Sequence, residues 1–252
     1  MFFTLPRMNK IVRALNILAL VLLLINIIVV FFYAPTERTM GNVQRIFYFH
    51  VGTAWVGAIA FFVALVAGVL YLRKPQVKWD TLGLSSVEIG LVFLTITTAA
   101  GSVWGRPAWN TWWLWSPRLT LITIAWLVYA AYFMLRGAVE DAEKRGRFAA
   151  IYVIISFITI IMAYVSIRVL RDIHPVVFGG TAESAQGAAE GLQEFEGGLE
   201  SMRMGLTLMM STITFTVIYL AWLFNRMRLQ YLKDEVDSLK IRVVNRLQGG
   251  GA

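Results

Sequence analysis

Six long apolar segments, separated by short clusters of charged residues, set the pattern of this chain. Each segment runs for 17 to 27 residues without an Asp, Glu, Lys or Arg. The hydrocarbon core of a bilayer is spanned by about 20 apolar residues in a helix, which satisfies its own backbone polar groups. The pattern therefore predicts an all-α integral membrane protein with six transmembrane helices, near residues 11–33, 48–72, 83–103, 117–136, 148–168 and 204–225.

Local signals mark several helix ends. Ser116 followed by Pro117 is typical of an N-cap and a first helical position, and predicts the start of the fourth helix. Ser85 and Glu88 have the spacing of a capping box and predict the start of the third helix, although Glu88 could instead be a buried proton-relay carboxylate. Pro175 is expected to end any continuation of the fifth helix.

The chain divides into one membrane domain and a short tail. We expect residues 1–225 to form a single six-helix membrane domain and residues 226–252 to form a cytoplasmic amphipathic tail. In the tail, apolar residues recur at alternating spacings of three and four, at Leu229, Leu232, Val236, Leu239 and Val243. Both a simple extension of the sixth helix and a separate partner-binding helix fit this spacing.

The distribution of positive charge predicts the orientation. Sixteen of the 23 Lys and Arg residues lie in segments on the same side as the two termini. The positive-inside rule therefore predicts a multi-pass protein of the plasma (inner) membrane with both termini in the cytoplasm. The net charge of +8 follows from this bias and from contact with anionic membrane lipid, so we expect no nucleic-acid partner.

Composition limits the available chemistry. Hydrophobic residues make up 58% of the 252 residues and charged residues only 15%, which argues against a soluble enzyme because soluble domains carry about 25% charged residues. Cysteine is absent, which excludes disulfides, thiolate ligands and covalent attachment of a cofactor through sulfur. Histidine occurs twice, at His50 and His174, and both positions fall on the predicted outer side.

A tryptophan cluster lies on the same side, in the predicted loop between the third and fourth helices. Five of the nine Trp residues fall within residues 104–115, together with Gly105, Pro107 and Asn110, which are typical of turns. The alternatives are an interfacial aromatic belt and a platform for a large flat apolar ligand. Concentration of the aromatic residues in one loop favours the platform.

The two histidines and the tryptophans together indicate a porphyrin. Two neutral imidazoles can occupy both axial positions of haem iron, so we predict a b-type, non-covalent haem with His50 and His174 as the iron ligands. Arginine pairs well with the haem propionates, and the outer-face candidates are Arg45, Arg106, Arg118, Arg168 and Arg171. Of these, Arg118, Arg168 and Arg171 are the predicted site residues, and ordinary headgroup contact is the alternative.

The tryptophan loop also carries a family resemblance. The run Trp104-Gly105-x-x-x-Trp109-x-Thr111-Trp112-Trp113-x-Trp115-x-x-Arg118-Leu119-Thr120, with one histidine on each side, resembles the WWD signature of the cytochrome c assembly family. The resemblance extends from about residue 10 to residue 225 and fits the short, six-span form of that family. The chain departs from the signature at Ser116, where the family usually has an Asp.

The resemblance implies a function in handling haem. It implies that His50 and His174 ligate haem at the outer face and that Trp104, Trp109, Trp112, Trp113 and Trp115 contact it. It further implies that haem is presented to a membrane-tethered haem chaperone for cytochrome c maturation. The implied partners are that chaperone, the ABC transporter subunits of the maturation system and a small membrane protein, and no enzymatic activity is expected.

Two other functions stay open at this point. One is a single-haem b-type membrane redox protein that uses the same two ligands. The other is a haem-translocating permease subunit. Electron transfer across the membrane through two bis-histidine haems is excluded, because no histidine lies near the predicted inner face.

Overall fold

A computed structural model describes residues 5–38, 40–170, 174 and 201–249. Within these residues, six helices are long and apolar enough to cross a membrane, which confirms the predicted all-α class. They are α1 (Leu5–Ile28, continued by the π-helical turn η1, Val29–Tyr33), α2 (Gln44–Arg73), α3 (Val77–Trp109), α4 (Pro117–Ala138), α5 (Ala142–Val169) and α7 (Met202–Gly249).

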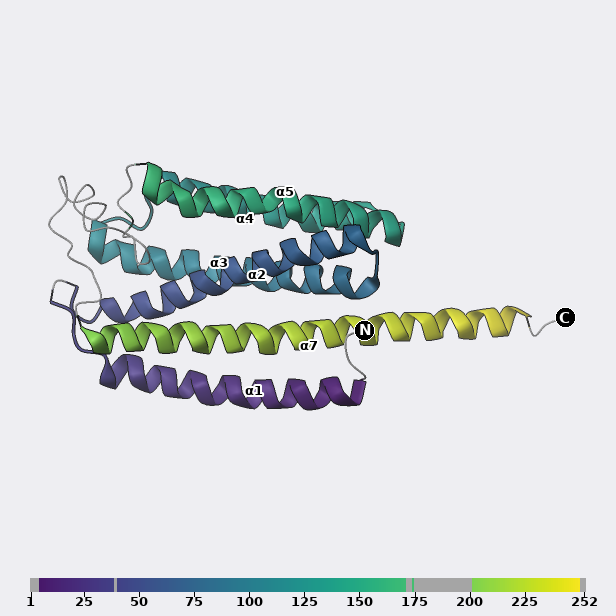
Figure 1. Cartoon of the computed structure of the whole chain (residues 1–252), viewed down its shortest axis with the longest axis horizontal. Coiled ribbons are helices and arrows are strands. Elements are labelled where there is room, and N and C mark those ends of the chain that lie inside the picture. Colours follow the sequence, from purple (N-terminus) through teal and green to yellow (C-terminus); the bar gives the residue numbers. More distant parts are fainter. Residues whose placement is uncertain (1–4, 39, 171–173, 175–200, 250–252) are drawn as a thin grey trace.

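The helices lie side by side, with α4 and α5 on one side, α2 and α3 next to them, then α7, and α1 outermost against α7 (Figure 1). We call the end of the bundle at which α1 and α3 begin the basal end, and the opposite end the cavity end. Helix α2 packs against α3, α5 and α7, and so connects α5 on one side with α7 on the other. Phe61 of α2 stacks on Tyr129 of α4 with ring centroids 3.8 Å apart.

Small residues let the central helix approach its neighbours closely. Ala60, Ala64 and Ala67 of α2 are fully buried. At Gly68, a Cβ atom would lie 3.0 Å from the backbone carbonyl oxygen of Ala150 in α5, so a larger residue would push the two helices apart. Association of helices in lipid depends on such close packing, because no hydrophobic effect drives apolar helices together in a bilayer.

Polar side chains join the first and last helices. Ser211 of α7 donates a 2.8 Å hydrogen bond to the side-chain oxygen of Asn26 in α1, and both residues are fully buried. Nearer the basal end, the Asn225 amide donates to the side-chain oxygen of Asn16 over 2.8 Å. These contacts explain why two asparagines interrupt an otherwise apolar first span.

Ion pairs close the basal end. Arg136 of α4 donates two hydrogen bonds to the two oxygens of Asp80 in α3, at 2.6 and 2.9 Å. Arg226 of α7 donates to Glu88 over 2.9 Å. The predicted capping box of Ser85 and Glu88 is therefore wrong: α3 begins eight residues earlier, at Val77, and Glu88 forms an interhelical ion pair. The charge-free run predicts the helix correctly but places its start too late, because the polar residues within 76–80 are typical of a connection.

The other predicted helix ends differ in how well they match. The Ser116 side chain accepts a hydrogen bond from the Leu119 amide and Pro117 is the first residue of α4, which confirms the predicted cap. Pro175 lies outside the described residues. Helix α7 runs without a break to Gly249 and projects beyond its neighbours (Figure 1), so the sequence after residue 225 continues the sixth helix.

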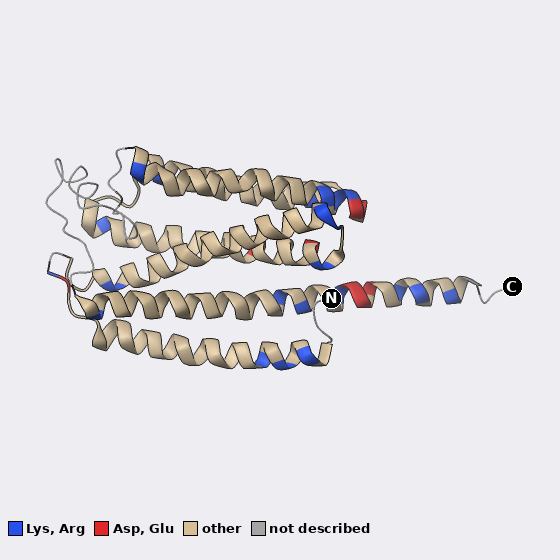
Figure 2. Ribbon diagram, viewed as in Figure 1, with Lys and Arg blue, Asp and Glu red and all other residues tan. Residues whose placement is uncertain are grey.

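Charge is distributed unevenly between the two ends. Figure 2 shows most Lys and Arg residues at the basal end and along the projecting part of α7. The middle of the bundle carries almost none of them. The side of the bundle that the positive-inside count assigns to the cytoplasm is therefore the basal end.

Candidate functional site

The cavity end holds a cavity of about 340 Å³ between α2, α3, α4 and α5. Its walls are mainly apolar and aromatic, and it reaches down to Phe61 and Leu94 in the middle of the bundle. Ligand sites for small molecules and cofactors are usually apolar concavities of roughly 300–1,000 Å³ with a few polar groups. The cavity is therefore large enough for most of an extended planar ligand.

The two histidines of the chain meet on the wall of this cavity. Their ring centroids are 6.1 Å apart and the ring planes are inclined by 52°. A metal–imidazole bond of about 2.0–2.1 Å on each side, added to the radius of each ring, would separate the two centroids by roughly 6 Å. The spacing of the rings therefore fits one metal atom between them.

His50 lies in the second turn of α2, and a hydrogen bond fixes its ring. The Nδ1 atom lies 2.9 Å from the Thr97 carbonyl oxygen of α3. A carbonyl oxygen only accepts, so Nδ1 carries the proton and Nε2 keeps the lone pair that a metal needs. Most metal-ligating histidines have such a partner on the second ring nitrogen.

His174 lies beyond the end of α5 and reaches the same cavity. Its ring centroid is 6.1 Å from that of Trp109. Burial, with the positive charge of Arg118 as the second cause, holds the pKa of His174 well below its usual range. The imidazole is therefore neutral at physiological pH, which is the form that coordinates iron.

Two of the tryptophans belong to α3 and were wrongly placed in a loop. Trp104 and Trp109 lie in the last two turns of α3, with their rings in an edge-to-face contact at 5.4 Å. Gly105 and Pro107, expected to form turns, are helical here. The helix ends only at Asn110, which adopts the left-handed conformation with φ 54° that suits a helix C-terminus.

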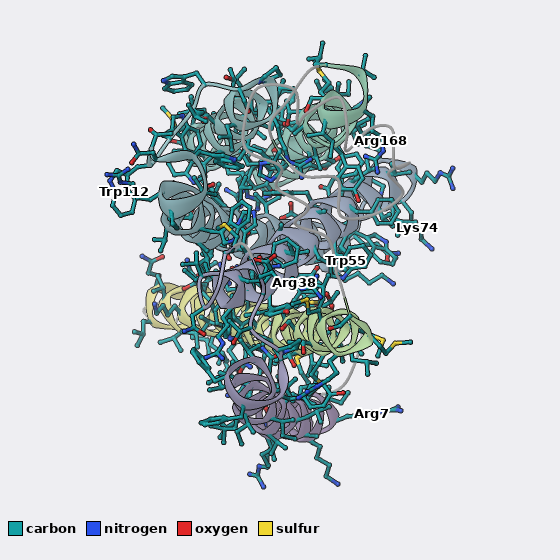
Figure 3. The ribbon with its side chains drawn as sticks, turned by 90° about the vertical axis from the view of Figure 1, so that its left-hand side faces the viewer. Arg7, Arg38, Trp55, Lys74, Trp112 and Arg168 are labelled. Atoms are coloured by element: carbon teal, nitrogen blue, oxygen red, sulfur yellow. The ribbon has the colours of Figure 1, made fainter. Side chains whose placement is uncertain are left out.

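The other three tryptophans follow the helix. Trp112 and Trp113 line the cavity, and Thr111 holds the segment by donating a 3.0 Å hydrogen bond to the Trp113 carbonyl. Trp112 is exposed and lies at one edge of the cavity end, as Figure 3 shows. Trp115 does not line the cavity: its side chain is 72% exposed and packs edge-to-face on Trp113.

Two of the predicted arginines lie at the cavity wall. Arg118 at the start of α4 and Arg168 near the end of α5 both place their guanidinium groups over the Tyr164 ring, at 6.0 and 5.1 Å from its centroid. Arg168 lies on the side of the cavity end opposite Trp112 (Figure 3). Arg171 lies outside the described residues.

Several residues of the site were not predicted from the sequence. Thr97 and Gly101 of α3 contact the His50 ring, and Trp55 of α2 and Tyr164 of α5 line the cavity. They lie inside apolar spans, where hydroxyl, glycine and aromatic residues are common. Gly101 alone offered a clue, because a glycine inside a helix usually has a packing or functional reason.

The fold and the site define a class: a multi-pass helical membrane protein with a tryptophan-lined cavity that holds a pair of imidazoles at one end. Comparison with known proteins is specific. Residues 2–242 match the model of the CcmC family, heme exporter protein C, and the chain belongs to this family.

Individual relatives agree with the family match. The chain is 27% identical to heme exporter protein C of Bradyrhizobium diazoefficiens over 216 residues, which are 85% of this chain and 76% of the relative. It is 33% identical to heme exporter protein C of Escherichia coli K12 over 161 residues, which are 64% of this chain and 65% of that protein. The Haemophilus influenzae protein of the same name is 27% identical over 86% of this chain and 83% of its own length.

Proposed function

We propose that this protein binds haem at the outer face of the plasma membrane and delivers it for cytochrome c maturation. His50 and His174 are the axial ligands of the iron, and the haem is b-type and non-covalently held, since the chain has no cysteine. The haem is cargo: this protein binds it, orients it and passes it on. The role requires no bond-making chemistry, and we assign no catalytic residue.

One observation carries the proposal. The two histidines of the sequence lie 124 positions apart, yet their ring centroids are 6.1 Å from each other on the wall of one apolar cavity. Two neutral imidazoles at this separation on one cavity wall suit a shared metal atom, since each ring nitrogen that carries a lone pair is a metal ligand. The family match and the names of the relatives agree with haem as that ligand.

The surroundings supply the remaining contacts. Trp104, Trp109, Trp112 and Trp113 provide aromatic surface for the macrocycle. Arg118 and Arg168 are within reach of propionates at the cavity wall, and we include Arg171 with them from the sequence. Trp115, exposed and outside the cavity, is better placed to meet the protein that receives the haem.

The orientation and the partners complete the proposal. The basal end with its positive charge faces the cytoplasm, together with both termini and the tail at 226–252. The cavity then opens on the outer side, where a membrane-tethered haem chaperone accepts the haem. ABC transporter subunits of the maturation system and a small membrane protein are the other proposed partners.

Absorption spectroscopy tests the ligands directly. We expect the purified protein, titrated with hemin in detergent, to give the spectrum of a low-spin, six-coordinate haem. His50→Ala and His174→Ala should each give a high-spin spectrum, and the double variant should lose the specific spectrum entirely. Added imidazole should restore the low-spin spectrum to the single variants, because it replaces the missing ligand in a folded site. A double variant that binds hemin like the wild type would contradict the proposal.

A further inference from the structure

The His50 ring lies directly against the backbone of α3, at a glycine. A Cβ atom added to Gly101 would lie 2.7 Å from Cε1 of His50 and 3.1 Å from Nδ1. The ring therefore occupies the space that any other side chain at position 101 would need. Glycine inside a helix costs about 1 kcal/mol relative to alanine, so this glycine is retained at a cost to the helix.

One face of α3 provides both the space that the His50 ring occupies and the acceptor of its hydrogen bond. Thr97 lies one helical turn before Gly101, and its carbonyl oxygen accepts the proton of His50 Nδ1 over 2.9 Å. The ring can reach this carbonyl only because Gly101 lacks a side chain. The glycine and the carbonyl together fix both the position of the ring and its tautomer.

Two buried hydroxyl groups fasten the turn of α2 that carries the histidine. The Thr97 hydroxyl donates to the Thr53 hydroxyl over 3.0 Å, and Thr53 donates to the backbone carbonyls of Phe49 and His50 at 2.9 and 3.0 Å. Thr53 is 2% exposed and Thr97 is 7% exposed, so water does not compete with these bonds. The main chain of His50 and its ring are thus both tied to Thr97, through the hydroxyl and the carbonyl.

We propose that Gly101 and Thr97 are positioning residues that hold His50 as the pre-oriented axial ligand, with Nε2 directed to the iron. This inference rests on the proposed haem-binding function. Hydrogen bonding at Nδ1 fixes ring orientation and raises the basicity of the ligating nitrogen, and loss of such a partner typically weakens metal binding. The site is therefore partly formed before haem arrives.

Gly101→Ala tests the proposal, with Gly83→Ala as the matched control. Both substitutions add one methyl group to a glycine of α3, but a Cβ at Gly83 would make only an ordinary contact of 3.6 Å with Ala67. In Gly101→Ala the His50 side chain must swing away, so we expect hemin affinity to fall about 10- to 100-fold. The hemin spectrum should shift from low spin to high spin, and added imidazole should restore low spin. Gly83→Ala should behave as the wild type.

Thr97→Val supplies a second measurement if Gly101→Ala reaches the membrane poorly. It keeps the carbonyl but removes the hydroxyl, and we expect hemin affinity to fall roughly fivefold through the loosened α2 turn. Thr123→Val is its control, because the Thr123 hydroxyl donates to the Leu119 carbonyl of its own helix and so takes no part in the joint between α2 and α3.

The possible results separate the inference from the function on which it rests. If His50→Ala abolishes low-spin binding while Gly101→Ala and Thr97→Val match their controls, the positioning role is wrong and the haem site stands. If the wild type binds no hemin, both are wrong. A low-spin spectrum lost in Gly101→Ala, and regained with imidazole, supports the positioning role.

Discussion

Helices α3 and α4 are joined by an ion pair at the basal end of the bundle and line a cavity at the other end. At the basal end, α3 and α4 are joined by the paired hydrogen bonds of Asp80 and Arg136. Midway, Trp126 of α4 donates a 2.9 Å hydrogen bond to the Thr95 hydroxyl of α3. At the cavity end, the same helices line an open space with Trp109 and Arg118.

The difference shows how a membrane protein keeps a site ready for a large ligand. At the basal end the ion pairs Arg136–Asp80 and Arg226–Glu88 join neighbouring helices, and we call these two pairs the clamp. At the cavity end the two histidines and four tryptophans of the cluster at 104–115 line the cavity, and α2 and α3 are joined one turn deeper by the hydrogen bond between Thr53 and Thr97. Because the clamp and the cavity lie at opposite ends, we expect that a variant can lower stability without lowering hemin affinity, and the reverse.

The largest expected effect is on the clamp. Arg136→Met leaves Asp80 without its partner at a site where the two side chains are 11% and 25% exposed. We expect the free energy of unfolding to fall by about 3 kcal/mol, the lower part of the range for a broken buried pair, since Asp80 keeps some access to water. Unfolding in mixed micelles measures this loss.

The comparison of the two ends adds a second readout for the same variant. Hemin affinity of the folded Arg136→Met fraction should stay within twofold of the wild type, because the pair lies at the opposite end from the cavity. Lys240→Ala, at an exposed ion pair on the projecting part of α7, should leave stability unchanged. A large loss of hemin affinity in Arg136→Met would show that clamp and site are one unit.

A smaller effect, on hemin affinity, is expected from the tryptophans. The sequence predicts Trp109 and Trp115 equally as haem contacts, but the structure separates them. Trp109 contacts Trp104 and His174, whereas Trp115 is largely exposed and outside the cavity. Trp109→Leu should weaken hemin binding about tenfold through lost aromatic contact and burial. Trp115→Leu should leave hemin affinity unchanged in the same titration. Equal losses in the two variants would mean that the loop closes over haem when it binds.

The spans and the pair of histidines could be predicted from sequence for physical reasons. A charge-free run of about 20 residues has one stable form in lipid, so the six helices follow from composition. His50 and His174 are the two imidazoles in the chain, and the charge count placed both on one side. Neither inference needs side-chain packing.

What could not be predicted depends on tertiary contacts. The polar residues before Ser85 looked like a connection, but Asp80 is compatible with helix once Arg136 pairs with it. Gly105 and Pro107 looked like turn residues, yet α3 continues through them to Trp109. Thr97 and Gly101 are ordinary span residues until the fold brings His50 against them.

The smallest expected effect concerns the joint between α1 and α7, which lies apart from both the clamp and the cavity. Asn26→Leu removes the acceptor of the buried Ser211 hydroxyl, and we expect a loss of about 1 kcal/mol in unfolding free energy, typical of interhelical hydrogen bonds in membranes. The double variant Asn26→Leu with Ser211→Ala should recover part of that loss, because it also removes the Ser211 hydroxyl that Asn26→Leu leaves without its acceptor. Hemin affinity should match the wild type in both. If the double variant is less stable than Asn26→Leu alone, packing around these side chains rather than their hydrogen bond stabilises the α1–α7 joint.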